Sequence, residues 1–317
     1  MDTLLLIDGN AIMHRAFHAL PPFKTKEGIP THVVYGFFTM LHKSINDYRP
    51  DHVVVCFDTP VQTFRNKMFK EYQAQRPQID NDFIVQIPIV KEALDKAAVV
   101  HLEKDGFEAD DLIGTIAHKF KSNGIKVLIL SGDRDILQLV DHNVFVITPQ
   151  LGLSNLKIYD VSEVQKKYGL VPQQIPDLKA LMGDPSDNYP GAKGIGPKTA
   201  AKLLQEYKTI ENLYTNLEKL EPKIKSILIK DRDDVFMSKK LAKIITDVNI
   251  KFEIEKTRFE KFNQDLKDYF LQYQMKSLVG RLFKEPSSAP PSPKSLRRPS
   301  KATKRKEKKN ENQMGLF

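Results

Sequence analysis

Short apolar runs alternate with helical patterns through the first half of the chain. The runs cover residues 3–7, 52–57, 98–101, 126–130 and 143–148. Continuous Val, Ile and Leu runs of this length are typical of strands buried on both faces of a parallel sheet. Between them, apolar residues recur at helical spacing over 33–45 and 112–120. This alternation predicts an α/β fold with a doubly wound parallel sheet.

The second half reads as helical. Asp160 and Glu163 form a capping-box pattern that opens a short helix, and Pro197 stands at the first position of another. Helical periodicity also covers 233–245 and 264–279. After Glu285 the composition shifts to Pro, Ser, Lys and Arg, which predicts disorder. We therefore expect an α/β domain over 1–160, a helical subdomain over 161–285 and a tail over 286–317.

Composition limits the classes of protein that fit. The chain has 317 residues, of which 41% are hydrophobic, so it is long enough for one large or two smaller domains. Its single cysteine, Cys56, allows no disulfide framework and suits a reducing compartment. The first residues lack the pattern of a signal peptide, and no apolar run approaches the roughly 20 residues that span a bilayer. We expect a cytoplasmic protein with no membrane contact.

The net charge of +9 is concentrated at one end. Residues 294–317 contain nine Lys or Arg and two acids, so they contribute +7 and the other 293 residues only +2. The basic tail could follow a nucleic acid electrostatically. For the rest of the chain, an argument for nucleic-acid binding has to depend on local clusters.

Acidic residues gather where the predicted strands end. They come from five segments, and they are Asp8, Asp58, Glu108, Asp110, Asp111, Asp133, Asp135, Asp184 and Asp187. Each one alone could be a helix cap or a turn residue. Because ligands bind at the carboxyl ends of strands in such sheets, we expect the nine to converge. Converging carboxylates need cations, and oxygen ligands favour Mg²⁺ or Mn²⁺, which indicates two-metal hydrolysis of a phosphodiester.

A glycine-rich turn at 191–202 offers a phosphate site. Its glycines let backbone amides approach an anion closely, and the helix expected from Pro197 adds its dipole. The expected contacts are Lys193, Gly194, Gly196, Lys198, Thr199 and Lys202. Such a turn reads phosphates and not bases, so it predicts binding without sequence preference. The alternative is a tight turn beside a solvated, lysine-rich face.

Residues 64–76 interleave cations with aromatic side chains directly after Asp58. This mixture suits a single-stranded nucleic acid, because rings stack on bases and cations follow phosphates. An ordinary amphipathic helix with snorkelling cations would have the same composition. The nearness of a candidate metal ligand favours the nucleic-acid interpretation.

Five motifs occur in one order: Leu-Ile-Asp8-Gly; Phe-Asp58; Gly-Phe-Glu108-Ala-Asp110-Asp111; Ser-Gly-Asp133-Arg-Asp135; and Gly-Asp184-Pro-Ser-Asp187-Asn, running into Gly-Ile-Gly196-Pro. Together they resemble the bacterial and phage 5′→3′ exonuclease (flap endonuclease) family. The same domain forms the N-terminal part of bacterial DNA polymerase I. The resemblance covers about residues 1–283, and we expect a stand-alone form because no polymerase region follows.

This resemblance implies a PIN-like parallel sheet flanked by helices, a helical arch at 60–90 and a helix–turn–helix element around 184–207. It implies cleavage of DNA with 5′ ends or flaps and of RNA–DNA primer junctions. The first metal would be held by Asp8, Asp58, Glu108, Asp110 and Asp111, and the second by Asp133, Asp135, Asp184 and Asp187. Arg65, Tyr72 and Arg76 would be arch residues that act in catalysis. The turn around Gly194–Gly196 would bind K⁺.

The chain ends in Gln313-Met-Gly-Leu316-Phe317. This pentapeptide resembles the bacterial sliding-clamp-binding motif, in which the glutamine and the two terminal apolar residues make the contacts. A chance match is the alternative for so short a motif. At the end of a tail with no core to join, an exposed Leu-Phe pair favours a clamp partner. We expect a nucleoid-associated monomer tethered in this way.

Two other functions remain open. A non-catalytic DNA-structure-binding, clamp-tethered protein is one, although a retired site would not need such a repulsive group of acids. An RNA-cleaving nuclease of the PIN type is the other. The lysine-bearing glycine turn, which suits duplex phosphates, argues against it.

One departure from the family pattern generates a prediction. The family's arch carries Tyr-Lys-x-x-Arg, whereas this chain has Gln73 at the lysine position. A missing cation near developing negative charge could cost several kcal/mol, roughly 3 or 4, in the transition state. We therefore expect Gln73→Lys, with Lys70 intact, to raise the single-turnover cleavage rate of a 5′ flap. An unchanged or lower rate would contradict this expectation.

Overall fold

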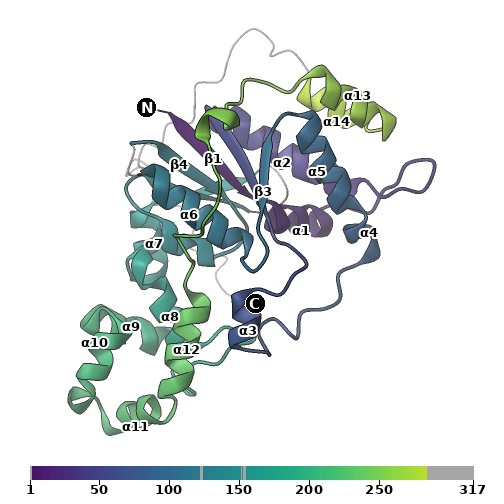
Figure 1. Cartoon of the computed structure of the whole chain (residues 1–317). Helices are drawn as coiled ribbons and strands as arrows, with labels where there is room; N and C mark the ends of the chain where they lie inside the picture. The colour runs from purple at the N-terminus through teal and green to yellow at the C-terminus, as the bar shows by residue number, and fades with distance from the viewer. Residues whose placement is uncertain (1, 122–123, 151, 153–154, 284–317) are drawn as a thin grey trace, which may run out of the picture. The chain divides into compact units, whose positions relative to one another are not determined.

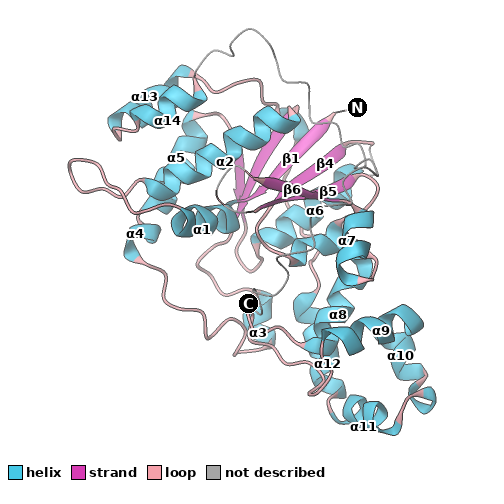
Figure 2. Cartoon of the chain, turned by 180° about the vertical axis from the view of Figure 1, so that it is seen from behind, coloured by secondary structure: helices cyan, strands magenta, loops and turns pink. Residues whose placement is uncertain are grey.

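The computed structural model describes residues 2–121, 124–150, 152 and 155–283. Its centre is one six-stranded sheet (Figures 1 and 2). The strands are β1 (Thr3–Asp8), β2 (His52–Phe57), β3 (Val100–Glu103), β4 (Lys126–Leu130), β5 (Val144–Pro149) and β6 (Leu156–Tyr159). Their order is β3-β2-β1-β4-β5-β6, and only β6 runs antiparallel to its neighbour. The order reverses between β1 and β4, which is where such sheets bind ligands.

Helices cover both faces of the sheet (Figure 2). Those of the first half are α1 (Gly9–Ala19), α2 (His32–Tyr48), α3 (Phe64–Met68), α4 (Asn81–Ile84), α5 (Gln86–Lys96) and α6 (Ala109–Lys121), with the 3₁₀-helix η1 (Asp135–Leu139). Leu5 and Ile7 of β1 face the core formed with α1, α2 and α5, whereas Leu4 and Leu6 face α6. Successive residues of a strand point to opposite faces, so a strand buried on both sides has to be continuously apolar.

The second half adds a helical part. Its elements are α7 (Val161–Tyr168), η2 (Pro172–Gln174), α8 (Ile175–Met182), α9 (Pro197–Tyr207), α10 (Ile210–Thr215), η3 (Leu217–Lys219), α11 (Pro222–Lys230), α12 (Arg232–Ala242), η4 (Ile254–Thr257), α13 (Gln264–Gln272) and α14 (Lys276–Leu282). No helix within the described ranges combines the length and the apolarity that crossing a bilayer requires.

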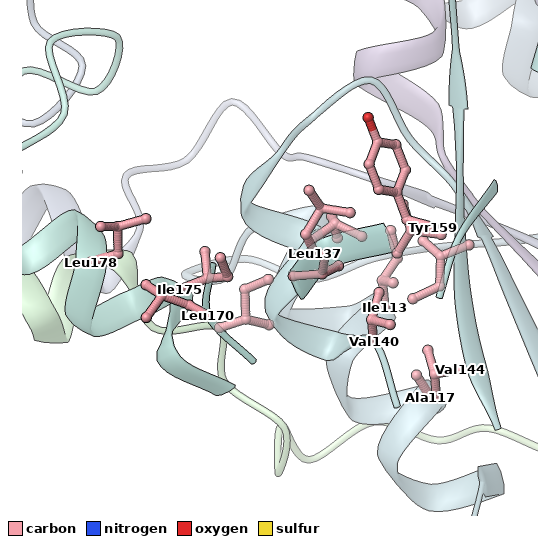
Figure 3. Close-up of a cluster of buried hydrophobic side chains, with 14 of the residues drawn as sticks. Ile113, Ala117, Leu137, Val140, Val144, Tyr159, Leu170, Ile175 and Leu178 are labelled. Atoms are coloured by element: carbon pink, nitrogen blue, oxygen red, sulfur yellow. The ribbon is translucent and has the colours of Figure 1, made fainter. Parts of the chain in front are cut away.

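The helical part shares its core with the sheet. Figure 3 shows buried side chains that run from Val144 of β5, through Leu137 of η1 and Ile113 of α6, to Ile175 and Leu178 of α8. These apolar contacts fix α8, and therefore the turn that follows it, relative to the strand ends. The chain then returns through α13 and α14 to the other face of the sheet, against α2 and α5.

The predicted α/β fold with a helical C-terminal part is confirmed, and the details differ in four places. Neither α1 nor the antiparallel β6 was predicted. The helical pattern at 264–279 is divided into α13 and α14, because Gln274 takes a positive φ of 59° between them. Within 60–90, the region expected to form the arch, α3 has only five residues and the chain between α3 and α4 is not helical (Figure 1).

Candidate functional site

Asp8 and Asp133 lie where the strand order reverses. Asp8 ends β1 and is 5% exposed; its Oδ1 accepts a hydrogen bond from the Ala11 amide at 3.0 Å, which caps α1. Its Oδ2 accepts from the Ser131 hydroxyl at 2.7 Å, and the Ser131 oxygen accepts from the Asp133 amide at 2.9 Å. Ser131, which the sequence did not single out, thus links the ends of the two central strands.

Three more acids join this edge through the start of α6. Asp58 follows β2, and its Oδ1 accepts from the Ala109 amide at 2.7 Å. This bond holds the first turn of α6 against the end of β2, and so brings Asp110 near Asp8 and Asp133, and Glu108 near Asp58. We name Asp8, Asp58, Glu108, Asp110 and Asp133 the first carboxylate group. Asp133, which was expected at the second metal, is included here because Ser131 links it to Asp8 and its charge acts on Asp110.

Burial and mutual repulsion set the charges of the first group. Burial, followed by the charge of Asp58, raises the pKa of Asp8 to about 7. Burial also raises the pKa of Glu108 to about 7, against the opposing effect of Arg65. The pKa of Asp110 is raised well above its usual value by burial, with Asp133 and Asp8 adding to the effect. A cation would relieve this repulsion and return the carboxylates to their ionised form.

A second carboxylate group consists of Asp135, Asp184 and Asp187. One oxygen from each lies within 4.8 Å of the others, and all three residues are buried. Asp135 begins η1, and Asp184 and Asp187 lie in the turn after α8. The turn is closed by two backbone hydrogen bonds between Asp184 and Tyr189, of 3.0 and 3.2 Å.

Lys179 of α8 was missed by the sequence reasoning. Its ammonium pairs with Asp184 at 2.5 Å and also with Asp135. Burial opposes ionisation of Asp184, but Lys179 outweighs it and lowers the pKa of that carboxyl. Burial instead raises the pKa of Asp135 to about 7, although Lys179 opposes the rise. The signal available in the sequence was one cation in the otherwise apolar stretch 178–182.

The second group fits a divalent cation of the Mg²⁺ class, because one oxygen of each of its three carboxylates lies within 4.8 Å of the others, and the first group has the same ligand chemistry. Their donors are carboxylate oxygens, which are the ligands that Mg²⁺ and Mn²⁺ prefer. Burial raises the pKa of Asp8, Glu108 and Asp135, although Arg65 contacts Glu108 and Lys179 contacts Asp135, so a further cation would favour the ionised form. The structure therefore places eight of the nine predicted acids in two groups, of which the second has three ligand oxygens within 4.8 Å of one another.

Asp111 is the ninth acid, and the structure places it elsewhere. It has no exposed surface, and both of its oxygens accept from the Arg65 guanidinium, at 2.7 and 2.9 Å. Arg65 was expected to act in catalysis, but it is only 2% exposed and faces the interior. The reason for both departures is their mutual neutralisation: a buried arginine needs a carboxylate, and a forked pair supplies the best geometry.

The other two expected arch residues face the second group. The Arg76 guanidinium donates to Asp187 Oδ1 at 2.7 Å, and the Gln73 side-chain amide donates to the same oxygen at 3.1 Å. The Tyr72 hydroxyl is 3.4 Å from Glu108 Oε2 and 3.5 Å from Asp187 Oδ2. The Gln73 backbone amide also donates to the Asp187 carbonyl, at 2.9 Å. The loop after α3 therefore lies against Asp187.

The glycine-rich turn leads into α9 as expected. Lys193, Gly194, Gly196, Lys198 and Lys202 are exposed, whereas Thr199 is half-buried. Gly194 has a φ of +103°, a value that glycine adopts without strain. The Lys193 amide donates to Asp231 at 2.7 Å, so this amide is already used within the protein. The proposed clamp residues Gln313, Leu316 and Phe317 lie outside the described residues.

Two family models match consecutive parts of the chain. The 5′-3′ exonuclease N-terminal resolvase-like domain matches residues 3–169, and the 5′-3′ exonuclease C-terminal SAM fold matches residues 170–265. The boundary between them falls just before α8.

Curated relatives include a 5′-3′ exonuclease of Aquifex aeolicus, 41% identical over 90% of this chain and 98% of that protein. DNA polymerase I of Caldicellulosiruptor bescii is 40% identical over 88% of this chain, which spans 33% of that longer protein. Among solved structures, a zinc-bound T5 5′-exonuclease shares the fold, with a TM-score of 0.62, 19% identity and coverage of 89% of this chain and 98% of that one.

The raised pKa values predict how pH and metal act on stability. Asp8, Glu108 and Asp135 have folded pKa values of about 7 and unfolded values near 4, so the metal-free folded protein binds more protons between these limits. In EDTA, the Tm should therefore fall as pH rises from about 5 to about 7. Added Mg²⁺ should release protons and raise the Tm more at about pH 8 than at about pH 6.

Thermal unfolding at several pH values, with EDTA or with saturating Mg²⁺, checks this prediction. Glu108→Gln should flatten the fall in EDTA, whereas the matched variant Glu218→Gln, at an exposed position, should not. A Tm in EDTA that does not fall over this range would contradict the prediction.

Proposed function

Because the chain belongs to the 5′-3′ exonuclease family, we propose that it is a structure-specific 5′ nuclease. It hydrolyses phosphodiesters at DNA 5′ ends, at flaps and at RNA–DNA primer junctions, in replication and repair. The observation that carries the proposal is the gathering of eight carboxylates from five segments at one edge of the sheet. Such substrates would place the protein in the cytoplasm at the nucleoid, and we propose that it acts as a monomer.

We propose that the first and second carboxylate groups each hold one divalent cation, Mg²⁺ or Mn²⁺. Bound there, the cations would lower the pKa of water and stabilise the charge of the transition state. Asp133 lies between β4 and Asp135 and connects the two groups. Asp8 and Asp58 are fixed by the capping bonds to α1 and α6, so their orientation does not depend on a ligand. A preformed arrangement of this kind costs no reorganisation at the moment of reaction.

The chain's own cations would act on the substrate side. Arg76 is 55% exposed at its side chain while it contacts Asp187, so it can also reach a phosphate. Tyr72 stacks on Tyr189, with ring centroids 6.4 Å apart, and is only 4% exposed. We propose that Arg76 contacts DNA, and that Tyr72 holds the loop between Glu108 and Asp187.

The glycine-rich turn would bind duplex phosphates away from the cleaved bond. Lys198 and Lys202 are exposed on the first turns of α9, beside Gly194 and Gly196. Support comes from the helix N-terminus, whose amides and dipole favour an anion. We also propose K⁺ at this turn, held by backbone carbonyls, on the resemblance of the motif alone.

A cleavage assay tests the proposed activity. The protein is incubated with a 5′-labelled flap and with a nicked duplex, in Mg²⁺, Mn²⁺ or EDTA. We expect cleavage with either metal and none in EDTA, and product length will separate endonuclease from exonuclease action. Asp184→Asn should lower the rate by roughly 10²-fold or more, because it removes a ligand oxygen and charge from the second group.

The matched variant Asp265→Asn, in the exposed first turn of α13, should cleave at the unchanged rate. Binding of the flap without any product in either metal would instead indicate the non-catalytic DNA-binding alternative.

We further propose that residues 313–317 bind a bacterial sliding clamp, since their sequence matches the clamp-binding pattern. Deletion of these five residues should abolish co-elution with the clamp in gel filtration and leave cleavage of a free flap unchanged. Replacement of Leu316 and Phe317 by alanine is the matched point variant. Retained co-elution after the deletion would contradict the proposal.

A further inference from the structure

Asp111 has no free lone pair to offer a metal. Its Oδ1 accepts from Arg65 Nη2 at 2.9 Å and from the Ile245 amide at 2.9 Å. Its Oδ2 accepts from Arg65 Nη1 at 2.7 Å and from the Glu108 amide at 3.1 Å. A carboxylate has about four acceptor sites, so these four hydrogen bonds fill it. The neighbouring Asp110, by contrast, belongs to the first carboxylate group.

Arg65 is equally committed. Besides the two bonds to Asp111, its Nε donates to the Leu241 carbonyl at 2.9 Å and its Nη2 donates to the Lys243 carbonyl at 3.0 Å. Its Nη1 also lies 3.2 Å from Oε2 of Glu108, a member of the first carboxylate group. The guanidinium thus connects α3, the start of α6 and the end of α12, and it contacts a candidate metal ligand from behind.

The segment 241–248, which leaves α12, is attached to α6 and η1 at further points. Gln138 of η1 donates to the Ala242 carbonyl and accepts from the Ile244 amide, both at 3.0 Å. The Thr115 hydroxyl oxygen accepts from the Val248 amide at 3.1 Å. A Cβ at Gly114 would lie 2.6 Å from Cγ2 of Ile244, so the segment packs on α6 without a gap. We name 241–248 the strap.

We propose that Arg65 and Asp111 are positioning residues: their buried pair fixes Glu108 and the base of the 64–76 loop against the strap, and Asp111 does not ligate metal. This inference rests on the proposed nuclease function for its role in the reaction. The strap continues α12, which packs on α8 and begins after Asp231, the residue that accepts the Lys193 amide of the glycine-rich turn. The pair therefore sets the distance between the DNA-binding elements and the first carboxylate group.

The proposed positioning role can be tested, because Arg65 and Asp111 compensate each other's charge in the interior. Removing one partner leaves a buried charge unpaired, whereas replacing both by apolar residues of similar volume can be tolerated. A metal ligand, in contrast, acts independently of Arg65. The two roles therefore predict different coupling between substitutions at 65 and 111.

Four proteins with substitutions suffice for the test: Asp111→Asn, Arg65→Lys, the double variant Arg65→Met with Asp111→Leu, and Asp184→Asn as the control at a proposed ligand. Mn²⁺ binding is titrated by electron paramagnetic resonance on each folded protein. Because either single substitution acts through the position of Glu108, we expect the Kd of Mn²⁺ to rise by a similar factor in Asp111→Asn and in Arg65→Lys and by less in the double variant, whereas Asp184→Asn should raise it at least about tenfold.

Single-turnover cleavage of a 5′ flap at saturating enzyme gives the second readout. Asp111→Asn should be slower by about 10- to 100-fold, since a misplacement of about 1 Å can cost about 10²-fold in rate, while the Kd for the flap in Ca²⁺ stays unchanged. The double variant should be no slower than Asp111→Asn, and Arg65→Lys, which keeps the charge, should be the fastest of the three.

A Kd for Mn²⁺ that rises tenfold in Asp111→Asn but not in Arg65→Lys would overturn the inference. It would also be overturned if the losses of cleavage rate caused by the substitutions at 65 and at 111 multiplied in the double variant, because the two residues would then act independently. If the parent protein cleaves nothing, the proposed function fails, but the Mn²⁺ titration and the coupling measured in Tm still decide whether Asp111 is a ligand. If Asp111→Asn does not fold, the double variant decides. A double variant that folds and binds Mn²⁺ with the affinity of the parent supports the proposed role of the pair. A double variant that folds but does not bind Mn²⁺ overturns the inference.

Discussion

Mutual repulsion among carboxylates at the carboxyl edge of the sheet is the constraint on which the site depends. Parallel strands deliver their ends to one edge, so Asp8, Asp58 and Asp133 cannot be far apart. The protein holds them there with hydrogen bonds that favour a fixed orientation, from Ser131 and from the first amides of α1 and α6. The hydrogen bonds supply no countercharge, and burial together with the charge of Asp58 raises the pKa of Asp8 to about 7.

Much of this site was predictable because it follows from the strand pattern. Asp8 and Asp58 directly follow apolar runs, and the order of such runs determines which ends meet. Asp110 and Asp111 show where prediction from sequence stops. Consecutive residues on a helix point about 100° apart, so only one of the two can face the strand ends. The sequence alone does not reveal that the other residue, Asp111, pairs with Arg65, which lies 46 positions away in the chain.

Contacts between residues far apart in the sequence also explain why Lys179 was missed and why the 60–90 region was predicted to be more helical than it is. Lys179 meets Asp135 only because the shared apolar core fixes α8 beside η1. After α3, the loop exchanges helical hydrogen bonds for contacts with the turn at 184–188: Gln73 with Asp187, and Asn188 with the Glu71 carbonyl at 2.7 Å. Local propensity was outweighed by these tertiary contacts, which periodicity does not encode.

The two carboxylate groups consequently differ in how their charge is compensated. The second group has cations of its own, because Lys179 contacts Asp135 and Asp184 and Arg76 contacts Asp187. A metal that enters the second group has to displace a side-chain cation or share these oxygens with it. In the first group, by contrast, burial favours the protonated, uncharged form of the carboxylates. If the two groups hold metal as proposed, affinity in the first group would depend on proton release, and affinity in the second on competition with Lys179 and Arg76 and on proton release from Asp135. Because Arg76 belongs to the loop that lies against Asp187, a metal held by the second group would be coupled to the position of that loop through one carboxylate.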